Sequence, residues 1–526
     1  MATVSLDRPR RVSVPVAAAI ALLAGLALVA WSIYVRTRAF GEYYWIDEGL
    51  SIGIAKHGLL DIPGVLREDG SPPLYYLLLH FWVGIFGTTE HATHALSLVF
   101  STLTIPAGLW AGWSLFGRRA GILSGIVCAG NPFLTAYAQE TRMYSLVVLL
   151  SLVCTACFLH LFVFRRRRYI PWFALSLVAM LYTHLWSAFF AMAAGVMTLW
   201  IIWRSDAAER RGLWRDALYG FGGAALLYLP WLPTAVYQLK HTAAPWANGP
   251  TWRAAQQIPR TLLGGYREIA LVAIVSAVGI ALAWHRRKRT DERAAWINLA
   301  LLAAMVALAW TISQASGVWV PRYFAIFAGP LLLALGWAFA RARVIGLVGL
   351  AILGIGFWFY PHTPQKQTLK SNVRLVATDG APRLKPGDLI LSTHPEQIPL
   401  IYHYMRQFGA TGQRYATELG YVPDVQVMDW RDAVDRLGKT RVSHNLVPML
   451  DALPVGHRLY LIRPIVSRKI EWLAPWTNLV KRRSAQWIHA IDRDPRFKRV
   501  LISNAFLSVG HRNGAVQGRL YVKTRR

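Results

Sequence analysis

The sequence predicts an all-α polytopic membrane domain of about eleven transmembrane helices, followed by a small soluble α/β domain. Of the 526 residues, 55% are hydrophobic and the mean hydropathy is +0.33, as in chains that cross a bilayer many times. Runs of about 18 or more mostly apolar residues recur from Val14 to Tyr360. The rest is mixed in polarity and contains turn signals such as Lys385-Pro386-Gly387-Asp388. We therefore predict a membrane domain over 1–361 and an extracytoplasmic domain over 362–526.

The first apolar run follows a basic N-terminus, with Arg8, Arg10 and Arg11 before residue 14. No small-residue cleavage site follows the run, so we interpret it as an uncleaved span over 14–35 rather than a signal peptide. The positive-inside rule then places the N-terminus in the cytoplasm.

Clusters of arginine divide the remaining apolar sequence into pairs of spans. With each cluster in the cytoplasm, the space between neighbouring clusters holds two crossings. The clusters are Arg118-Arg119, Arg165 to Arg168, Arg204 to Arg215, Arg286 to Arg289 and Arg341 to Arg343. The predicted spans after the first are 92–116, 120–138, 143–164, 170–184, 187–203, 216–234, 268–284, 294–312, 323–340 and 344–360.

The segment 72–87 does not fit this alternation. It is short for a span and opens with Pro72-Pro73, so we predict a juxtamembrane or re-entrant helix at the outer interface. The first outer loop then covers 36–91, and eleven crossings leave the C-terminal domain outside. The sequence thus predicts a multi-pass protein of the inner or plasma membrane.

The chain carries a net charge of +30. Cytoplasmic loops and anionic lipid head groups explain most of this charge, and we recognise no nucleic-acid-binding module. The region 361–526 holds 27 Lys+Arg against 12 Asp+Glu, although we expect it outside, because long domains translocate regardless of charge. External positive charge suits an anionic, lipid-linked substrate.

Four groups of polar residues fall on the outer side of this topology. Ionisable groups at span ends are costly, so each marks a candidate functional site. A carboxylate can accept a proton from an attacking hydroxyl, and arginines with tyrosines can hold a phosphate leaving group. The groups are Asp47-Glu48, Ala138 to Ser145 with Glu140, Arg142 and Tyr144, Tyr182 to Trp186 with His184, and Val320 to Phe324 with Arg322 and Tyr323.

These motifs, in this order, resemble the GT-C superfamily of polytopic glycosyltransferases. The resemblance covers roughly residues 10–340 and is strongest to the branch of protein O-mannosyltransferases and the lipid A aminoarabinose transferase. It rests on "DE" in the first outer loop, "PPLYY" with Tyr75 and Tyr76, "ETRMYSL", "YTH" and "PRY". It implies a polyprenyl-phosphate sugar donor, a reaction on the outer face, Asp47 as the base and Glu48 as the second acid of the pair.

One position departs from the aminoarabinose transferase branch, in which a lysine directly before Pro-Pro helps to bind lipid phosphate. Ser71 stands there. The phosphate-binding role then falls to Arg142, Arg322 or the loop that contains Lys240 and His241. Metal-dependent members need further carboxylates in the second outer loop, where this chain offers Glu140. We therefore expect a metal-independent enzyme without a cofactor.

The C-terminal region predicts a strand, a turn and a helix over Gly387 to Met405, and further strands at 457–466 and 518–526. We expect it to bind acceptor or glycan, or to cover the membrane cavity. The segment Glu471 to Arg483 mixes tryptophans with basic residues, which fits the membrane surface, a sugar site or an ordinary domain surface.

The sequence thus predicts transfer of one sugar from a polyprenyl phosphate to a glycan, lipid or protein acceptor, with inversion by analogy with inverting glycosidases. Two alternatives remain open: a transporter or flippase of lipid-linked sugars, and a non-catalytic subunit that binds lipid carriers. The acids at positions 47 and 48 also suit a simple helix N-terminus.

Overall fold

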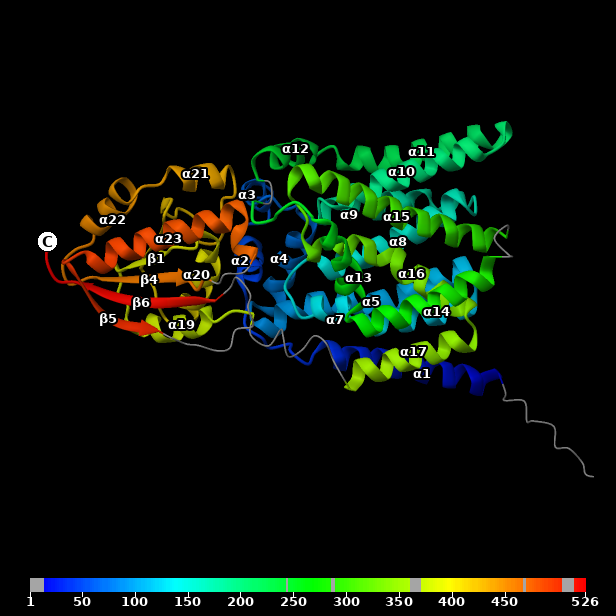
Figure 1. The fold of residues 1–526 in the computed structure, drawn as a ribbon, viewed down its shortest axis with the longest axis horizontal. Helices are drawn as coiled ribbons and strands as arrows, with labels where there is room; N and C mark the ends of the chain where they lie inside the picture. Colours follow the sequence, from blue (N-terminus) through cyan, green and yellow to red (C-terminus); the bar gives the residue numbers. More distant parts are fainter. Residues whose placement is uncertain (1–13, 243–244, 285–288, 360–369, 467–469, 504–514) are drawn as a thin grey trace, which may run out of the picture.

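The computed structural model describes residues 14–242, 245–284, 289–359, 370–466, 470–503 and 515–526. A bundle of long helices forms one end of the molecule and a six-stranded sheet forms the other (Figure 1). Short helices of the first loop lie between them: α2 (Ile46–Ala55), α3 (Ile62–Asp69) and α4 (Leu74–Phe86). The predicted boundary at 361–362 lies outside the described residues.

The bundle contains seven helices long and apolar enough to cross a membrane, within the described part of the chain. They are α1 (Val14–Arg36), α5 (Glu90–Phe116), α8 (Tyr144–Phe162), α10 (Ser187–Arg204), α14 (Tyr266–Trp284), α15 (Thr290–Ser316) and α16 (Ala325–Arg341). The other helices in the predicted spans are α6 (Arg118–Ala129), α7 (Pro132–Tyr137), α9 (Ile170–Thr183), α11 (Ala207–Tyr228) and α17 (Val344–Phe359). A multi-pass membrane protein is therefore supported, while the count of eleven spans is not confirmed.

Two predicted spans differ from the helices that form. The predicted span 120–138 is divided, because Gly130 ends α6 and the side chain of Asn131 caps α7 by accepting from the backbone N–H of Leu134 at 3.0 Å. The predicted span 216–234 overlaps α11 only as far as Tyr228, where this helix ends, and its last residues belong to the next helix, Leu232–His241. Helix α11 begins nine residues before the predicted span, at Ala207, and carries charged residues in its first turns.

The segment predicted to lie at the interface forms α4, a helix of 13 residues. At about 1.5 Å per residue it reaches roughly two thirds of a hydrocarbon core. Its length agrees with the prediction, and its depth in the membrane stays a prediction.

The centre of the bundle is formed by α8 and α16, the two most buried of the apolar helices. Gly329 permits their contact, since a Cβ at this position would lie 2.4 Å from the backbone nitrogen of Leu152. The hydroxyl of Ser151 donates to the carbonyl oxygen of Ile326 at 2.6 Å. Small residues and interhelical hydrogen bonds of this kind are typical of membrane helix packing.

The C-terminal sheet is mixed, with the strand order β3-β2-β1-β4-β6-β5. Strand β1 (Leu389–Ser392) pairs in parallel with β2 (Arg414–Thr417) and β4 (Arg458–Pro464), and the other pairings are antiparallel. The remaining strands are β3 (Gly420–Tyr421), β5 (Phe497–Ser503) and β6 (Val516–Lys523). The strand, turn and helix predicted over 387–405 correspond to β1 and to α20 (Ile398–Gln407), and the strands predicted at 457–466 and 518–526 correspond to β4 and β6.

Helices cover both faces of this sheet (Figure 1). On one face, α19 (Val373–Gly380) and α20 (Ile398–Gln407) share a core with strands β1, β4 and β6. On the other face lie α22 (Val447–Asp451) and α23 (Pro475–Arg493), with α21 (Ala433–Lys439) beside α23. In the segment 471–483, for which a membrane surface, a sugar site and an ordinary domain surface were all left open, Trp472 and Trp476 are buried. These two tryptophans therefore belong to the core.

The first loop and the C-terminal region meet through α2. A Cβ at Gly49 would lie 2.9 Å or less from the backbone of Leu400, and one at Gly53 would lie 1.9 Å from the carbonyl oxygen of Gln426. These two glycines, one helical turn apart, let the backbones approach closely. The contact fixes α2 against the C-terminal region, and α2 carries Asp47.

A reporter fused after Gly87 tests the role of α4. Because a 13-residue helix is too short to cross the hydrocarbon core, we expect the fusion point to lie on the same side of the membrane as residues 36–60, which we predict to be the outer side. Periplasmic phosphatase activity at this site is the expected result. Cytoplasmic reporter activity after Gly87 would contradict the topology.

Candidate active site

A cavity of about 1570 Å³ lies among the first loop, the ends of several bundle helices and the C-terminal region. It exceeds the roughly 300–1,000 Å³ of most small-molecule pockets, so it has room for two substrates. Its lining includes six of the residues that the sequence predicts as site residues: Asp47, Glu140, Arg142, His184, Arg322 and Tyr323.

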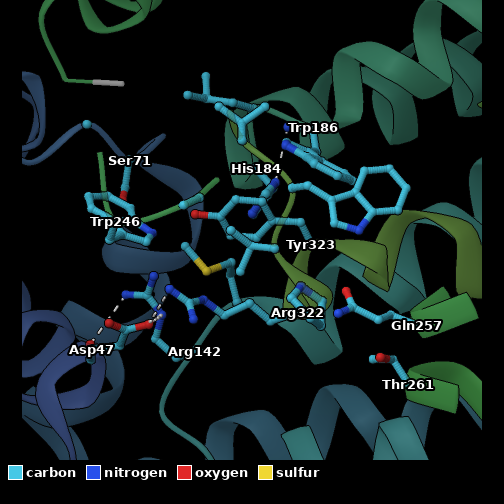
Figure 2. A pocket seen from close by; sticks show the side chains of 18 of the residues that line it. Asp47, Ser71, Arg142, His184, Trp186, Trp246, Gln257, Thr261, Arg322 and Tyr323 are labelled. Atoms are coloured by element: carbon cyan, nitrogen blue, oxygen red, sulfur yellow. Dashed lines mark hydrogen bonds and ion pairs between the residues drawn. The ribbon is translucent and has the colours of Figure 1, made fainter. Parts of the chain in front are cut away.

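Asp47 lies in the first turn of α2, which begins after Trp45 in extended conformation. Its Oδ2 is 3.4 Å from Nη2 of Arg322 and 4.0 Å from Nε of Arg142; Figure 2 shows these three side chains together. Both distances exceed those of good hydrogen bonds. Within the described part of the chain, Asp47 Oδ2 accepts no hydrogen bond, so this oxygen is available to a proton.

Arg142 is held firmly in the segment between α7 and α8. Its Nη1, which carries two hydrogens, lies 3.3 Å from the carbonyl oxygen of Asp47 and 3.1 Å from the hydroxyl groups of both Ser51 and Tyr76, and its two N–H groups are shared among these three acceptors. Three fixed acceptors around one nitrogen set the direction of the guanidinium group. Tyr76 therefore supports the site without lining the cavity.

Arg322 approaches from the other end of the sequence, in the 3-10 helix η3 (Pro321–Phe324) before α16. Its guanidinium group lies 5.6 Å from the ring centroids of both Trp45 and Tyr323, which stabilises the cation. Its side chain is 22% exposed, against 11% for Arg142. Arg322 is thus the more accessible of the two cations beside Asp47.

His184 ends α9 and packs against Tyr323, with 4.7 Å between the ring centroids. Its Nδ1 accepts the backbone N–H of Trp186 at 3.1 Å, which leaves the ring proton on Nε2. Tyr144 lies 5.9 Å from His184 and 6.5 Å from Tyr323, ring to ring. Tyr144 itself is fully buried behind the lining.

Glu48, Tyr75 and Lys240 have surroundings that differ from the predicted ones. Tyr75 is buried against Tyr76, and Lys240 is exposed and absent from the cavity lining. His241 pairs with Asp432 at 3.2 Å instead of facing the cavity. Among the basic residues of 235–267, Arg260 lines the cavity, whereas Lys240 lies on the exposed end of α12 (Leu232–His241).

Glu48 is fully buried and belongs to a cluster of charged groups. Its carboxylate lies 3.1 Å from Nζ of Lys370 and 2.7 Å from Nε2 of His94, and it accepts the backbone N–H of Thr141 at 2.8 Å. It also accepts the backbone N–H of Trp45 at 3.3 Å, which caps α2. Glu48 therefore fixes the start of α2 and the segment before Arg142, and does not face the cavity.

The charges around Glu48 decide its ionisation. Burial alone would raise its pKa, but the positive charge of Lys370 and the hydrogen bond with His94 outweigh burial and lower the pKa to about 2. Glu48 is consequently an anion at all physiological pH values and a poor proton acceptor. Its contacts hold the start of α2 in place, and the predicted assistance of Glu48 to the base stays a prediction.

Asp69 is a cavity-lining carboxyl group that the sequence reasoning missed. It lies at the end of α3 and is 7% exposed. Burial raises its pKa to about 6, the charge of Asp47 adds to this, and Ser71 and Arg142 act in the opposite direction. This acid, three residues before the Pro-Pro motif, was visible in the sequence, but nothing in its spacing marked it as part of the site.

No protein-family model and no curated protein sequence matches this chain. Several solved structures match its fold. ArnT from Cupriavidus metallidurans bound to undecaprenyl phosphate has a TM-score of 0.58 at 13% identity, with 96% of this chain and 98% of that chain covered.

Two other enzymes match with similar scores. The arabinofuranosyltransferase AftD from Mycobacteria has a TM-score of 0.55 at 14% identity. The match includes 96% of this chain but only 40% of the AftD chain. The archaeal oligosaccharyltransferase AglB from Archaeoglobus fulgidus has a TM-score of 0.53 at 11% identity, with 96% and 75% covered. These enzymes are GT-C glycosyltransferases. At such low identities the matches show the fold alone, and it is the fold that the motifs led us to expect.

Replacing Lys370 by Met tests the buried cluster. The change leaves the Glu48 carboxylate without its main counter-charge, which costs roughly 3–5 kcal/mol in buried ion pairs. We expect a clear fall in the unfolding temperature of the purified protein, measured by thermal shift in detergent, and partial recovery when Glu48→Gln is added. Lys498→Met on the exposed side of β5 is the matched control; an equal effect of the two lysine variants would refute the role of Lys370.

Proposed function

We propose that the protein is an integral membrane glycosyltransferase that moves one sugar from a polyprenyl-phosphate donor to an acceptor hydroxyl on the outer face of the membrane. The observation that carries the proposal is the arrangement of Asp47 with Arg142 and Arg322 in one large cavity. A base and two phosphate-binding cations from three distant segments are the groups that this reaction needs.

The phosphate and the lipid of the donor would occupy different parts of the cavity. Its phosphate would take the guanidinium groups of Arg142 and Arg322, since arginine binds phosphate oxygens with two parallel N–H donors. The lipid would follow the apolar part of the lining, which α7, α10 and α15 provide: Phe133, Ala136, Ala188, Phe189, Met192 and Ile312. Undecaprenyl phosphate in the matching ArnT structure and dolichol phosphate in the AglB structure support a lipid of this class.

The proposed reaction is a single displacement. The acceptor hydroxyl gives its proton to Asp47 as its oxygen attacks the anomeric carbon. The bond between that carbon and the phosphate oxygen breaks, and its electron pair leaves with the polyprenyl phosphate. Attack from the face opposite to the phosphate inverts the anomeric centre. Because the phosphate is a good leaving group, no acid is needed to protonate it.

The position of Asp47 between two arginines supports a proposal for how the base becomes available. Arg142 and Arg322 face Asp47 in the structure, and the donor phosphate competes with Asp47 for the same cations. When the phosphate binds, Asp47 loses its counter-charges and is left to accept the proton of the hydroxyl. We propose that this exchange couples donor binding to activation of the base, without a metal ion or cofactor.

Replacing Asp47 by Asn tests the base. The amide cannot accept the proton, so we expect turnover to fall at least about 100-fold, while binding of polyprenyl phosphate persists. The assay measures release of polyprenyl phosphate from a labelled polyprenyl-phosphate sugar by the purified protein. Near-normal turnover of the variant would exclude Asp47 as the base, and vectorial movement of uncleaved donor would favour the flippase alternative.

The raised pKa of Asp69 leads us to expect that binding of lipid phosphate depends on pH. Its pKa of about 6 means that it is neutral below pH 6 and negative above, where it repels the phosphate. At pH 5 the wild type and the Asp69→Asn variant should bind undecaprenyl phosphate with the same Kd. At pH 7.5 the Kd of the wild type should be about fivefold higher than that of the variant, which corresponds to about 1 kcal/mol of binding free energy.

The comparison with the Asp69→Asn variant removes the contribution of the phosphate itself, whose own ionisation is the same in both proteins. Binding is measured at both pH values in the same detergent. A ratio of the two Kd values that does not change with pH would show that Asp69 does not titrate beside the phosphate.

A further inference from the structure

The C-terminal region provides part of the cavity lining with a chemistry unlike that of the helical bundle. It contributes His394, Glu396, Trp430, Leu473 and Thr477, which we call the C-terminal wall. The cations that line the described cavity, Arg142, Arg260 and Arg322, all belong to the bundle and its loops. The two sides of the cavity therefore suit different ligands.

The sheet topology places this wall at the position where sheets with parallel strands bind ligands. The chain leaves β1 towards β2 on one side and returns to β4 on the other side of β1, so the strand order reverses at β1. In sheets with parallel strands, ligands bind beyond the carboxyl ends of the strands at such a reversal. His394 and Glu396 come directly after the carboxyl end of β1.

A pair of hydrogen-bonding groups is buried at this position. His394 is 1% exposed and Glu396 is 6% exposed. Nε2 of His394 lies 2.9 Å from Oε1 of Glu396, and the indole N–H of Trp476 donates to both oxygens of Glu396 at 3.0 and 2.9 Å. In the described part of the chain, Nδ1 of His394 has no hydrogen-bond partner. A buried polar atom without a partner at a cavity wall indicates a place for a ligand hydroxyl.

Aromatic side chains stand beside this pair. Trp430 lines the cavity together with Trp246 of the outer loop, and their ring centroids are 4.5 Å apart. Aromatic rings accept the apolar C–H face of a sugar, while a carboxylate and an imidazole bind its hydroxyl groups. Apolar surfaces with a few fixed polar groups of this kind orient a specific ligand.

The negative charge of the C-terminal wall disfavours binding of an anionic ligand there. The region 361–526 carries 27 Lys+Arg against 12 Asp+Glu, yet it contributes a carboxylate and none of its described Lys or Arg side chains to the cavity. Glu418 is buried nearby, after the carboxyl end of β2. Burial, together with the charge of Glu396, raises the pKa of Glu418 to about 8. A phosphorylated or carboxylated acceptor would meet the negative charge of Glu396 here.

We propose that the C-terminal wall is the acceptor subsite and that it takes a neutral glycan, so that the hydroxyl deprotonated in transfer belongs to a sugar. This inference rests on the proposed function for the direction of transfer. The binding of a neutral glycan at His394, Glu396 and Trp430 is independent of it. The glycan would stack on the tryptophans and direct its hydroxyl groups to the His394–Glu396 pair.

Binding of defined oligosaccharides to the full-length protein tests the proposal. The probes are linear hexasaccharides of glucose, mannose, galactose and N-acetylglucosamine, with a serine- and threonine-containing peptide for comparison, and the readout is saturation-transfer NMR in detergent. We expect at least one hexasaccharide to bind the wild-type protein and to bind Glu396→Gln and His394→Asn at least tenfold more weakly. Asp435→Asn, which removes an exposed carboxylate of α21 away from the cavity, should bind like the wild type.

The outcomes separate this proposal from the proposed function. Glycan binding that is lost in Glu396→Gln but kept in Asp47→Asn supports the subsite, even when donor cleavage is absent and the proposed transferase function fails. Donor cleavage without binding of any hexasaccharide, or with equal binding by Glu396→Gln, overturns the subsite and leaves the transferase function intact. Binding of the peptide in a Glu396-dependent manner overturns the glycan assignment. Unfolding temperatures of both variants, matched to the wild type, establish that the folded wall is being tested.

Discussion

The carboxylate of Glu48 contacts the start of its own helix and three segments distant in the chain, and the geometry of the candidate site depends on these contacts. It accepts the backbone N–H groups of Trp45 and Thr141, faces His94 of α5 and is paired with Lys370. A buried carboxylate without such partners would cost several kcal/mol. The energy of this cluster is therefore low only when α2, the segment before Arg142 and the beginning of the C-terminal region are all in place.

Adjacent acids in α2 have separate tasks because of helix geometry. Successive residues of an α-helix point about 100° apart, so Asp47 faces the cavity while Glu48 faces the interior. Further along the same helix, Gly49 and Gly53 contact the backbone of the C-terminal region. One short helix thus carries the cavity carboxylate of Asp47, the buried carboxylate of Glu48 and two glycines in close backbone contact. The C-terminal region therefore packs against α2.

The sequence predicted the parts of the site that are marked by isolated polar residues next to apolar runs. Asp47, Arg142, His184 and Arg322 were found because charge at a membrane edge is unusual, and the structure brings all four to one cavity. The motif order also predicted the GT-C fold. Three of the six strands, β1, β4 and β6, were predicted from the sequence, whereas β2, β3 and β5 were not. The division of the predicted span 120–138 into α6 and α7 was missed, because apolar residues stand on both sides of Asn131 and Pro132.

Other features had no sequence signal because they arise from contacts between distant segments. Lys370 looks like any surface lysine, and its burial depends on Glu48, 322 positions away. His394 and Glu396 acquire their significance only when the end of β1 reaches the cavity. Lys240 and Arg260 belong to one basic loop, and which of them lines the cavity depends on how helix α12 is oriented. A count of charged residues cannot make this distinction, because it does not say towards which side of a helix each side chain points.

The pairing of Asp47 with two arginines also bears on how product leaves in the proposed reaction. The donor phosphate is a diester with one negative charge, whereas the released polyprenyl phosphate is a monoester that carries up to two. The same cations therefore hold the product more strongly than the donor. Asp47 is protonated by the transfer and cannot compete at that moment. Once it loses the proton to solvent, its carboxylate again attracts Arg142 and Arg322, and this competition displaces the product phosphate, so the base that starts the reaction also resets the cavity for the next donor.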